Sequence, residues 1–199
     1  MSAHVYLVDD DDAIRDSLGW LLESRGVVCL SYPSAEDFLA TWNLSLSGCI
    51  VLDIRMDGMS GPELFDILRG RGCKLPVIFL TGHGDVPMAV SALKQGAFDF
   101  VEKPCNDNEL VNRVIEALQL DENRRLAASD ADTVHALSTR LTTRERQVME
   151  RVLAGTLNKV IADELQISMR TVEVHRANVF EKMGVRTAVE LAQLLAGKR

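Results

Sequence analysis

Long apolar runs are absent from this chain of 199 residues. A membrane-spanning helix needs roughly 20 consecutive apolar residues, and no segment of the sequence approaches that length. Near the N-terminus, four consecutive acids at residues 9–12 interrupt what could have been the apolar core of a signal peptide. We therefore expect a cytoplasmic protein that does not enter a membrane.

Paired cysteines and flexible linkers are absent as well. The cysteines lie 20, 24 and 32 residues apart, without the close spacing of a zinc site or a redox dithiol, at Cys29, Cys49, Cys73 and Cys105. Residues 105–154 contain neither glycine nor proline, which excludes a Gly/Ser tether between domains. We expect reduced cysteines and a largely helical linker over residues 121–139, in which 128–133 is the only loop-like stretch.

Positive charge is scarce in the first part of the chain only. The whole chain has a formal net charge of −7, but residues 1–120 carry 18 acids and 9 bases (−9), whereas residues 140–199 carry 7 acids and 11 bases (+4). This asymmetry predicts two domains with different partners, and it indicates that the second domain binds a polyanion.

Short β-branched runs alternate with segments of helical periodicity in the first 120 residues. The predicted strands are residues 5–8, 27–30, 49–52, 77–80 and 98–101, and the predicted helices are residues 13–24, 35–42, 61–69, 87–94 and 108–118. Continuously apolar strands that alternate with helices are typical of a parallel sheet covered on both faces. Residues 1–120 are therefore predicted to form an α/β domain, a flavodoxin-like, doubly wound (βα)₅ fold.

Residues 140–199 are predicted to form an all-α domain of four helices. Thr142 and Glu145 have the spacing of a capping box, and Gly155 would close the helix that they begin. A helix over 158–165 is followed by a break at 166–167 and by a helix that Ser168 caps and that runs to residue 183, and residues 187–195 form the last one. Two helices joined by so tight a turn, the second of them basic, indicate a helix-turn-helix.

Polar residues follow four of the predicted strands. Asp9, Asp10, Asp53, Thr81 and Lys103 come directly after strands whose carboxyl ends meet at one edge of the sheet. Carboxylates ~4 Å apart repel by about 4 kcal/mol per pair at an effective dielectric of 20, so Lys103 and a hard cation such as Mg²⁺ are expected among them. Asp53 is then placed to attack phosphorus, with Thr81 and Lys103 beside the acyl phosphate. Each acid alone is better explained as a helix cap or a solvated loop residue; the combination favours the pocket.

At this point the chain resembles the receiver domains of two-component response regulators. The resemblance rests on Leu7-Val-Asp-Asp-Asp, Leu52-Asp-Ile-Arg-Met, Met59-Ser-Gly, the run Thr81-Gly-His-Gly-Asp-Val-Pro-Met-Ala-Val, and Glu102-Lys-Pro. The C-terminal part is similar to the LuxR-type helix-turn-helix in Arg144-Glu-Arg-Gln-Val, Asn158-Lys, Ile161-Ala and Arg170-Thr-Val-Glu-Val-His-Arg-Ala-Asn-Val. The pairing of these two domains is that of the FixJ/NarL class.

The resemblance implies a phosphorylation-dependent transcriptional regulator. It makes Asp53 the phosphoacceptor for a sensor histidine kinase, assigns Asp9, Asp10 and the Arg55 backbone carbonyl to Mg²⁺, and makes Thr81 and Phe100 the switch residues. It also implies a cis Lys103-Pro104 peptide, a homodimer after phosphorylation, binding to a double-stranded DNA operator, and RNA polymerase as a further partner.

This chain departs from the usual receiver pattern at two positions. Asp57 stands where most relatives have proline, which predicts a less rigid loop with one more negative charge near the pocket. Cys105 stands where most have a large apolar residue, which predicts thinner packing. Phosphorylation is retained, and the lifetime of the acyl phosphate is left open.

The helix over residues 168–183 is the predicted recognition helix. Val172, Val179 and Met183 fall on one face of a helical wheel and are expected to be buried. The residues expected at or near DNA are Lys159, Arg170, Thr171, Glu173, Val174, Arg176, Ala177, Asn178, Lys182 and Arg186. Among them, Val174 and Ala177 are small enough to approach base edges. The residues that suit phosphates are Lys159, Arg176, Lys182 and Arg186. His175 has no second ligand at metal-binding spacing and is expected to pack on the helix flank.

Two other functions fit parts of the sequence. A Mg²⁺-dependent phosphatase also uses an aspartyl phosphate, but it normally has a second acid two residues after the nucleophile, where this chain has Arg55. A constitutive DNA-binding protein with an inactive N-terminal domain would not need the complete set of acids, hydroxyl and amine. We therefore expect a regulator and not an enzyme that turns over an external substrate.

Overall fold

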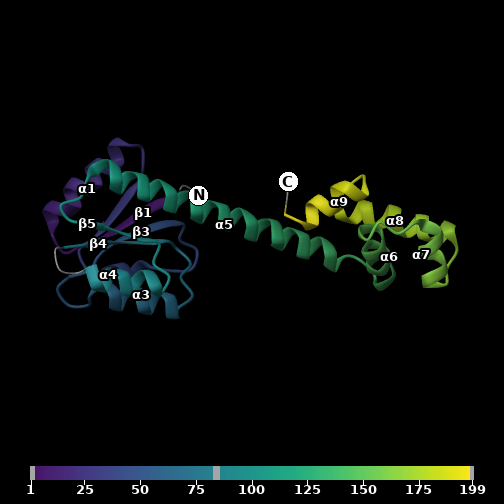
Figure 1. Cartoon of the computed structure of the whole chain (residues 1–199), viewed down its shortest axis with the longest axis horizontal. Helices are drawn as coiled ribbons and strands as arrows, with labels where there is room; N and C mark the ends of the chain where they lie inside the picture. The colour runs from purple at the N-terminus through teal and green to yellow at the C-terminus, as the bar shows by residue number, and fades with distance from the viewer. Residues whose placement is uncertain (1–2, 83–85, 198–199) are drawn as a thin grey trace. The chain divides into compact units, whose positions relative to one another are not determined.

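The computed structural model describes residues 3–82 and 86–197 and divides the chain into two compact units, Met1–Arg124 and Arg125–Arg199 (Figure 1). Of the run that begins at Thr81, residues His83, Gly84 and Asp85 lie outside the described part. Each unit has its own apolar core.

A five-stranded parallel sheet with the order β2-β1-β3-β4-β5 forms the centre of the N-terminal unit, which confirms the doubly wound (βα)₅ prediction. The strands are β1 (His4–Val8), β2 (Cys29–Tyr32), β3 (Gly48–Asp53), β4 (Val77–Thr81) and β5 (Asp99–Glu102). The helices that alternate with them are α1 (Asp12–Ser24), α2 (Ala35–Thr41), α3 (Gly61–Gly70), α4 (Val86–Lys94) and α5 (Asp107–Thr139).

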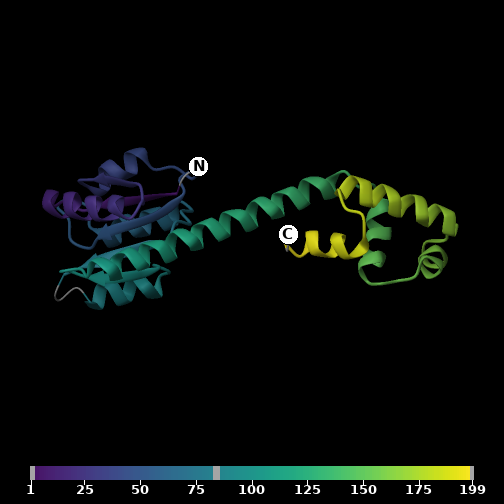
Figure 2. The same ribbon diagram turned by 90° about the horizontal axis from the view of Figure 1, so that it is seen from above.

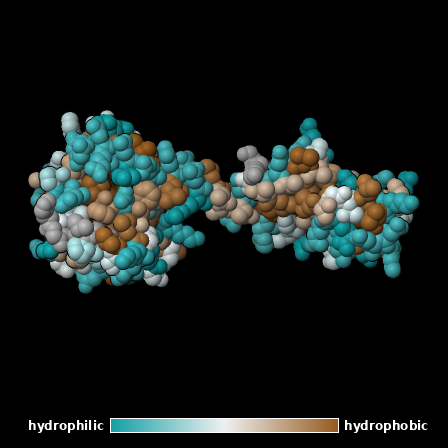
Figure 3. Space-filling model, viewed as in Figure 1, coloured by the Kyte–Doolittle hydropathy of each residue, from teal (hydrophilic) through white to brown (hydrophobic). Residues whose placement is uncertain are grey.

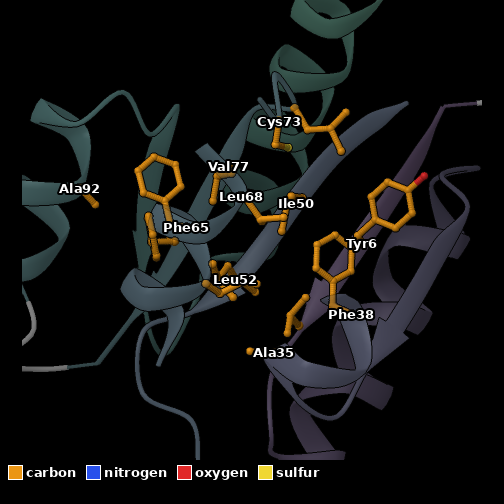
Figure 4. Close-up of a cluster of buried hydrophobic side chains, with 14 of the residues drawn as sticks. Tyr6, Ala35, Phe38, Ile50, Leu52, Phe65, Leu68, Cys73, Val77 and Ala92 are labelled. Atoms are coloured by element: carbon orange, nitrogen blue, oxygen red, sulfur yellow. The ribbon is translucent and has the colours of Figure 1, made fainter. Parts of the chain in front are cut away.

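Alternate residues of each strand face opposite layers of helices. On β1, Val5 and Leu7 pack against α1 and α5, whereas Tyr6 and Val8 pack on the side of α2, α3 and α4. Figure 1 shows α1 and α5 above the sheet and α3 and α4 below it. The second layer contains the aromatic cluster of Figure 4, in which the rings of Tyr6 and Phe38 are 5.7 Å apart. Burial on both faces explains why the three central strands β1, β3 and β4 are mostly apolar, whereas the edge strands β2 and β5 also carry exposed and polar residues.

Strand β2 begins two residues later than predicted. Residues 27 and 28 are β-branched, but the Val27 N–H donates to the carbonyl of Leu22 at 3.0 Å and so still belongs to the end of α1. Gly26, with φ +76°, makes this turn possible. Local composition alone does not distinguish a closing turn from the strand that follows it.

Helix α5 is continuous over 33 residues (Figure 2), so the predicted loop at residues 128–133 is wrong. The segment contains no glycine or proline that would interrupt it, and the Thr133 hydroxyl donates to the Ser129 carbonyl one turn earlier. The helix anchors to the first unit through Asp121, whose buried Oδ2 accepts from the Gly48 N–H at 2.9 Å. Across the described residues, none of the helices combines the length and apolarity needed to cross a membrane.

The C-terminal unit contains the four predicted helices, α6 (Thr143–Leu153), α7 (Asn158–Leu165), α8 (Met169–Met183) and α9 (Ala188–Leu195). The capping box of Thr142 and Glu145 is present, and Ser168 caps α8 as expected. The turn between α7 and α8 depends on Gln166, a non-glycine residue in the left-handed region with φ 54°. Val172, Val179 and Met183 are buried, which confirms the predicted inner face of α8.

Candidate functional site

The carboxyl ends of β1, β3 and β4 bring three polar residues together at one edge of the sheet. Asp9 directly follows β1, Asp53 ends β3, and Thr81 ends β4. Val8 pairs with Leu52, and Asp53 pairs with Leu80, so the three positions are adjacent in register. Asp9 and Thr81 are fully buried and Asp53 is 6% exposed. Buried carboxylates of this kind require a cationic or hydrogen-bonding partner.

Lys103 supplies that partner from the segment after β5. Its Nζ lies 2.7 Å from Asp9 Oδ2 and 2.5 Å from Asp53 Oδ1, and its side chain is 21% exposed. The Lys103-Pro104 peptide is cis, as predicted. One ammonium group therefore bridges two carboxylates that come from different strands.

The pocket shifts the ionisation of its members. Burial raises the pKa of Asp53, and the hydrogen bond and charge of Lys103 oppose that rise only in part. Burial alone would lower the pKa of Lys103, but its bonds to Asp53 and Asp9 outweigh this effect and raise it. Lys103 is therefore held in its charged form next to the two acids.

The remaining acid of the predicted metal site has a different partner. Asp10 is exposed, and its Oδ2 accepts a hydrogen bond from the Asp57 N–H at 2.8 Å. The Arg55 N–H donates to Asp53 Oδ2 at 2.8 Å. Among the described residues, no three His, Cys, Asp or Glu side chains are grouped so that they could hold a metal ion. The donor set still fits Mg²⁺ chemically, because two or three carboxylates, a backbone carbonyl and water are the oxygen ligands that this ion prefers.

Thr81 and Phe100 occupy neighbouring strands, as a coupled pair requires. The Thr81 Oγ1 donates to the Gly82 carbonyl at 3.2 Å, and the Lys103 N–H donates to the Thr81 carbonyl at 2.7 Å. Phe100 pairs with Phe79 in the sheet. Its side chain is half-buried and packs against the apolar cluster on the side of α2, α3 and α4. The role of these two residues as a switch stays a prediction.

All four cysteines are free thiols. Cys105 is half-buried and packs against the layer formed by α1 and α5. Burial raises the pKa of the Cys105 thiol, as it does for Cys29, whose pKa is about 11. Cys105 therefore serves as a small apolar residue at this position.

In the C-terminal unit, α7 and α8 form the predicted pair of helices around the turn at Gln166. The exposed side chains on α8 include Arg170, Glu173, Val174 and Ala177, and Lys159 on α7 and Arg186 after α8 are also exposed. Thr171, Arg176, Asn178 and Lys182 are half-buried. Val174 is 52% exposed and is therefore accessible on the outer face of α8.

Two of the basic residues expected at DNA have partners within the unit. Arg176 Nη1 donates to Asn158 Oδ1 at 2.6 Å and its guanidinium lies over the Phe180 ring at 5.6 Å. Lys182 Nζ lies 2.7 Å from Glu145 Oε2. The capping-box spacing identified Glu145 in the sequence, but nothing local indicated that its second partner would be a lysine 37 residues away. Contact of either base with DNA stays a prediction.

His175 is half-buried on the flank of α8, and its buried Nδ1 has no hydrogen-bond partner. The sequence predicts a packed residue and not a metal ligand at this position. The described part of the chain places no cluster of metal-binding side chains around it.

The N-terminal unit has an acidic pocket at the strand ends of a doubly wound sheet, and the C-terminal unit has a helix-turn-helix. This combination is typical of a class of signalling protein, and comparison with known proteins identifies the family. Residues 5–115 match the response regulator receiver domain, and residues 139–195 match the bacterial regulatory proteins of the luxR family. The chain is 50% identical over 196 residues to the C4-dicarboxylate transport transcriptional regulatory protein DctR of Rhodobacter capsulatus, covering 98% of this chain and 100% of that protein.

Solved structures agree with this assignment. The response regulator StyR is similar with a TM-score of 0.87 and 40% identity, covering 98% of this chain and 99% of that one. Full-length FixJ from B. japonicum is similar with a TM-score of 0.64 and 41% identity, covering 100% and 98%. The protein belongs to the two-component response regulators of the FixJ/NarL class, and it is a transcriptional regulator with a receiver and a LuxR-type DNA-binding domain.

Proposed function

We propose that Asp53 accepts a phosphoryl group from a sensor histidine kinase and that this modification controls DNA binding. The single observation that carries the proposal is the bridge from Lys103 Nζ to both Asp9 and Asp53 at the buried sheet edge. Such a bridge keeps an ammonium group next to the nucleophile before a phosphoryl group arrives. The same ammonium can then stabilise the phosphoryl oxygens without further rearrangement.

In the proposed transfer, an Asp53 carboxylate oxygen attacks the phosphorus of a phosphohistidine. A P–O bond to Asp53 forms while the P–N bond breaks, and the imidazole of the kinase leaves with the electron pair of that bond and takes up a proton. Lys103 and the Thr81 hydroxyl donate to the phosphoryl oxygens. Asp9, Asp10, Asp53 and the Arg55 carbonyl would hold Mg²⁺, which would supply neutralising positive charge at this site when bound.

We propose that the phosphorylated receiver dimerises through the face formed by α4, β5 and α5. Met88, Val90 and Ile115 on α4 and α5 are each about two fifths exposed. Figure 3 shows apolar (brown) residues among polar (teal) ones on the side of the N-terminal unit that faces the viewer. When Thr81 turns towards the phosphoryl oxygens, Phe100 fills the space behind it and reshapes this face.

The C-terminal unit is proposed to bind the major groove through α8. Val174 and Ala177 face base edges, and Lys159 and Arg186 contact phosphates. A dimer would present two such helices to a two-fold symmetric operator.

The test begins with the nucleophile. Acetyl phosphate should label the full-length protein at one site through an acyl phosphate bond that hydroxylamine and alkali cleave, and Asp53→Asn should abolish the label. Asp66→Asn, at an exposed position of α3, should not change it. Labelling that persists in Asp53→Asn contradicts the assignment. Repeated turnover of a phosphomonoester would instead support a phosphatase.

A further inference from the structure

Carboxylates hold the loop between β3 and α3 through its backbone amides. Within residues 55–60, four N–H groups donate to acidic side chains of four different segments: Arg55 to Asp53, Asp57 to Asp10, Met59 to Glu36, and Ser60 to Glu63. Two of these acids, Asp53 and Asp10, belong to the proposed metal and phosphoryl site. The loop is therefore tied to the state of that site through its backbone.

The bond from Asp57 to Asp10 orients the Asp10 carboxylate towards the loop. The Asp57 N–H is 2.8 Å from Asp10 Oδ2, and no group of three acids within the described residues is arranged to hold a metal ion. Asp9 and Asp53 face Lys103, while Asp10 faces the loop. Asp10 is not grouped with Asp9 and Asp53 in this structure, so its carboxylate has to move to join them at a cation, and a movement away from the loop weakens the bond from the Asp57 amide.

We propose that the backbone amide of Asp57 is a positioning group that withholds Asp10 from the divalent cation and lowers the affinity of the site for Mg²⁺. This inference rests on the proposed function, because it requires that the acidic pocket binds Mg²⁺. The position is decisive because a proline at residue 57 has no N–H to donate. The residue at this position therefore acts on the metal affinity through its backbone amide, in addition to any effect of its side-chain charge.

A matched pair of variants isolates the amide. Asp57→Ala removes the carboxylate and keeps the N–H, whereas Asp57→Pro removes both. The dissociation constant for Mg²⁺ is measured by calorimetric titration of each full-length variant in its metal-free form. We expect the constant for Asp57→Pro to be about three- to tenfold lower than that for Asp57→Ala, which is the range expected for one net hydrogen bond. Equal or weaker binding by Asp57→Pro overturns the proposal.

A second measurement needs no substitution, so it tests the proposal even if Asp57→Pro fails to fold. In the NMR spectrum of the wild-type protein, saturation with Mg²⁺ should move the Asp57 amide proton upfield and speed its hydrogen exchange, because its acceptor leaves. An Asp57 amide that stays protected at saturation overturns the inference while the metal site itself stands.

If wild-type protein binds no Mg²⁺ but Asp57→Pro does, the inference is supported; if neither binds it, both the metal site and the inference fail.

Discussion

At the residue scale, the second unit contains a buried ion pair that the resemblance to DNA-binding domains did not predict. Glu145 is 2% exposed, accepts from the Thr142 N–H at 2.8 Å and pairs with Lys182. Burial would raise the pKa of Glu145, but the bonds from Lys182 and Thr142 outweigh it and lower the pKa to about 2. The ion pair joins the first turn of α6 to the last turn of α8.

Because the pKa of Glu145 is lower in the folded state than in the unfolded chain, its stabilising effect is present above its ordinary pKa of 4.5 and disappears as the pH falls from there towards 2. Glu145→Gln should lower the free energy of unfolding of this unit at neutral pH by about 1–2 kcal/mol and should flatten its acid dependence. Hydrogen exchange of α6 amides in the full-length protein measures both effects. Glu150→Gln, at an exposed position of the same helix, is the control. An unchanged pH profile in Glu145→Gln would contradict the assignment.

Lys159 and Val174 test how α8 is oriented on DNA. Lys182 is a poor probe because its substitution also removes the partner of Glu145. Lys159→Ala should weaken binding to specific and random DNA equally and lower the salt slope by about one counterion. Val174→Ala should reduce the ratio of specific to non-specific affinity, with a loss of about 1 kcal/mol on specific DNA.

Both affinities are measured at fixed salt on a site selected from random DNA, with Lys74→Ala in the receiver as the control. A ratio that Val174→Ala leaves unchanged and Lys159→Ala alters would show that the orientation is wrong.

At the scale of the elements, α5 makes further hydrogen bonds to the receiver after the apolar residues that pack on the sheet. Asp121 and Arg124 lie in the segment that the sequence analysis assigned to the linker, yet Asp121 accepts from Gly48 and Arg124 Nη1 donates to the Lys74 carbonyl at 3.3 Å. Gly48 is the first residue of β3, and Asp53 is the last. The strand that carries the proposed phosphoacceptor is thus bound at its other end to the helix that continues into the second unit.

Asp121→Ala should destabilise the receiver by about 1–3 kcal/mol, because it leaves the buried Gly48 N–H without an acceptor. Asp121→Asn keeps an acceptor oxygen and should retain most of the stability. Urea unfolding followed by tryptophan fluorescence reports on the receiver alone, since both tryptophans, Trp20 and Trp42, lie in it. Glu122→Ala, at an exposed neighbouring position, should change the stability by less than about 0.5 kcal/mol. Equal stabilities for Asp121→Ala and Glu122→Ala would disprove the role of this hydrogen bond.

At the scale of the whole molecule, phosphorylation is expected to change the oligomeric state. Light scattering of the full-length protein at micromolar concentration should show a shift from monomer to dimer when beryllofluoride and Mg²⁺ are added, because Thr81 and Phe100 then reshape the α4-β5-α5 face. Asp53→Asn should stay monomeric under the same conditions. Identical masses with and without beryllofluoride across this concentration range would refute dimerisation through the receiver.

The sequence by itself determined the elements, the order of the two domains and the residues at the strand ends. Periodicity and capping are encoded within a few residues, as the capping box at Thr142 and the N-cap at Ser168 demonstrate, and the carboxyl ends of parallel strands must share one edge of the sheet. Local information led to a wrong prediction for residues 128–133. Their composition resembles that of a loop, but no glycine or proline interrupts the helix, and α5 continues through them.

Only the tertiary structure decided which partner each polar group has. Lys103 bonds to Asp9 and Asp53 across 94 and 50 residues of sequence, Asp121 to Gly48 across 73, and Asp57 to Asp10 across 47. No local pattern encodes such pairs, because each depends on how separate strands and helices are packed and on which acceptors that packing leaves free. The physical reason is that a hydrogen bond acts over about 3 Å, and the chain brings these groups within that range only when the whole domain has folded.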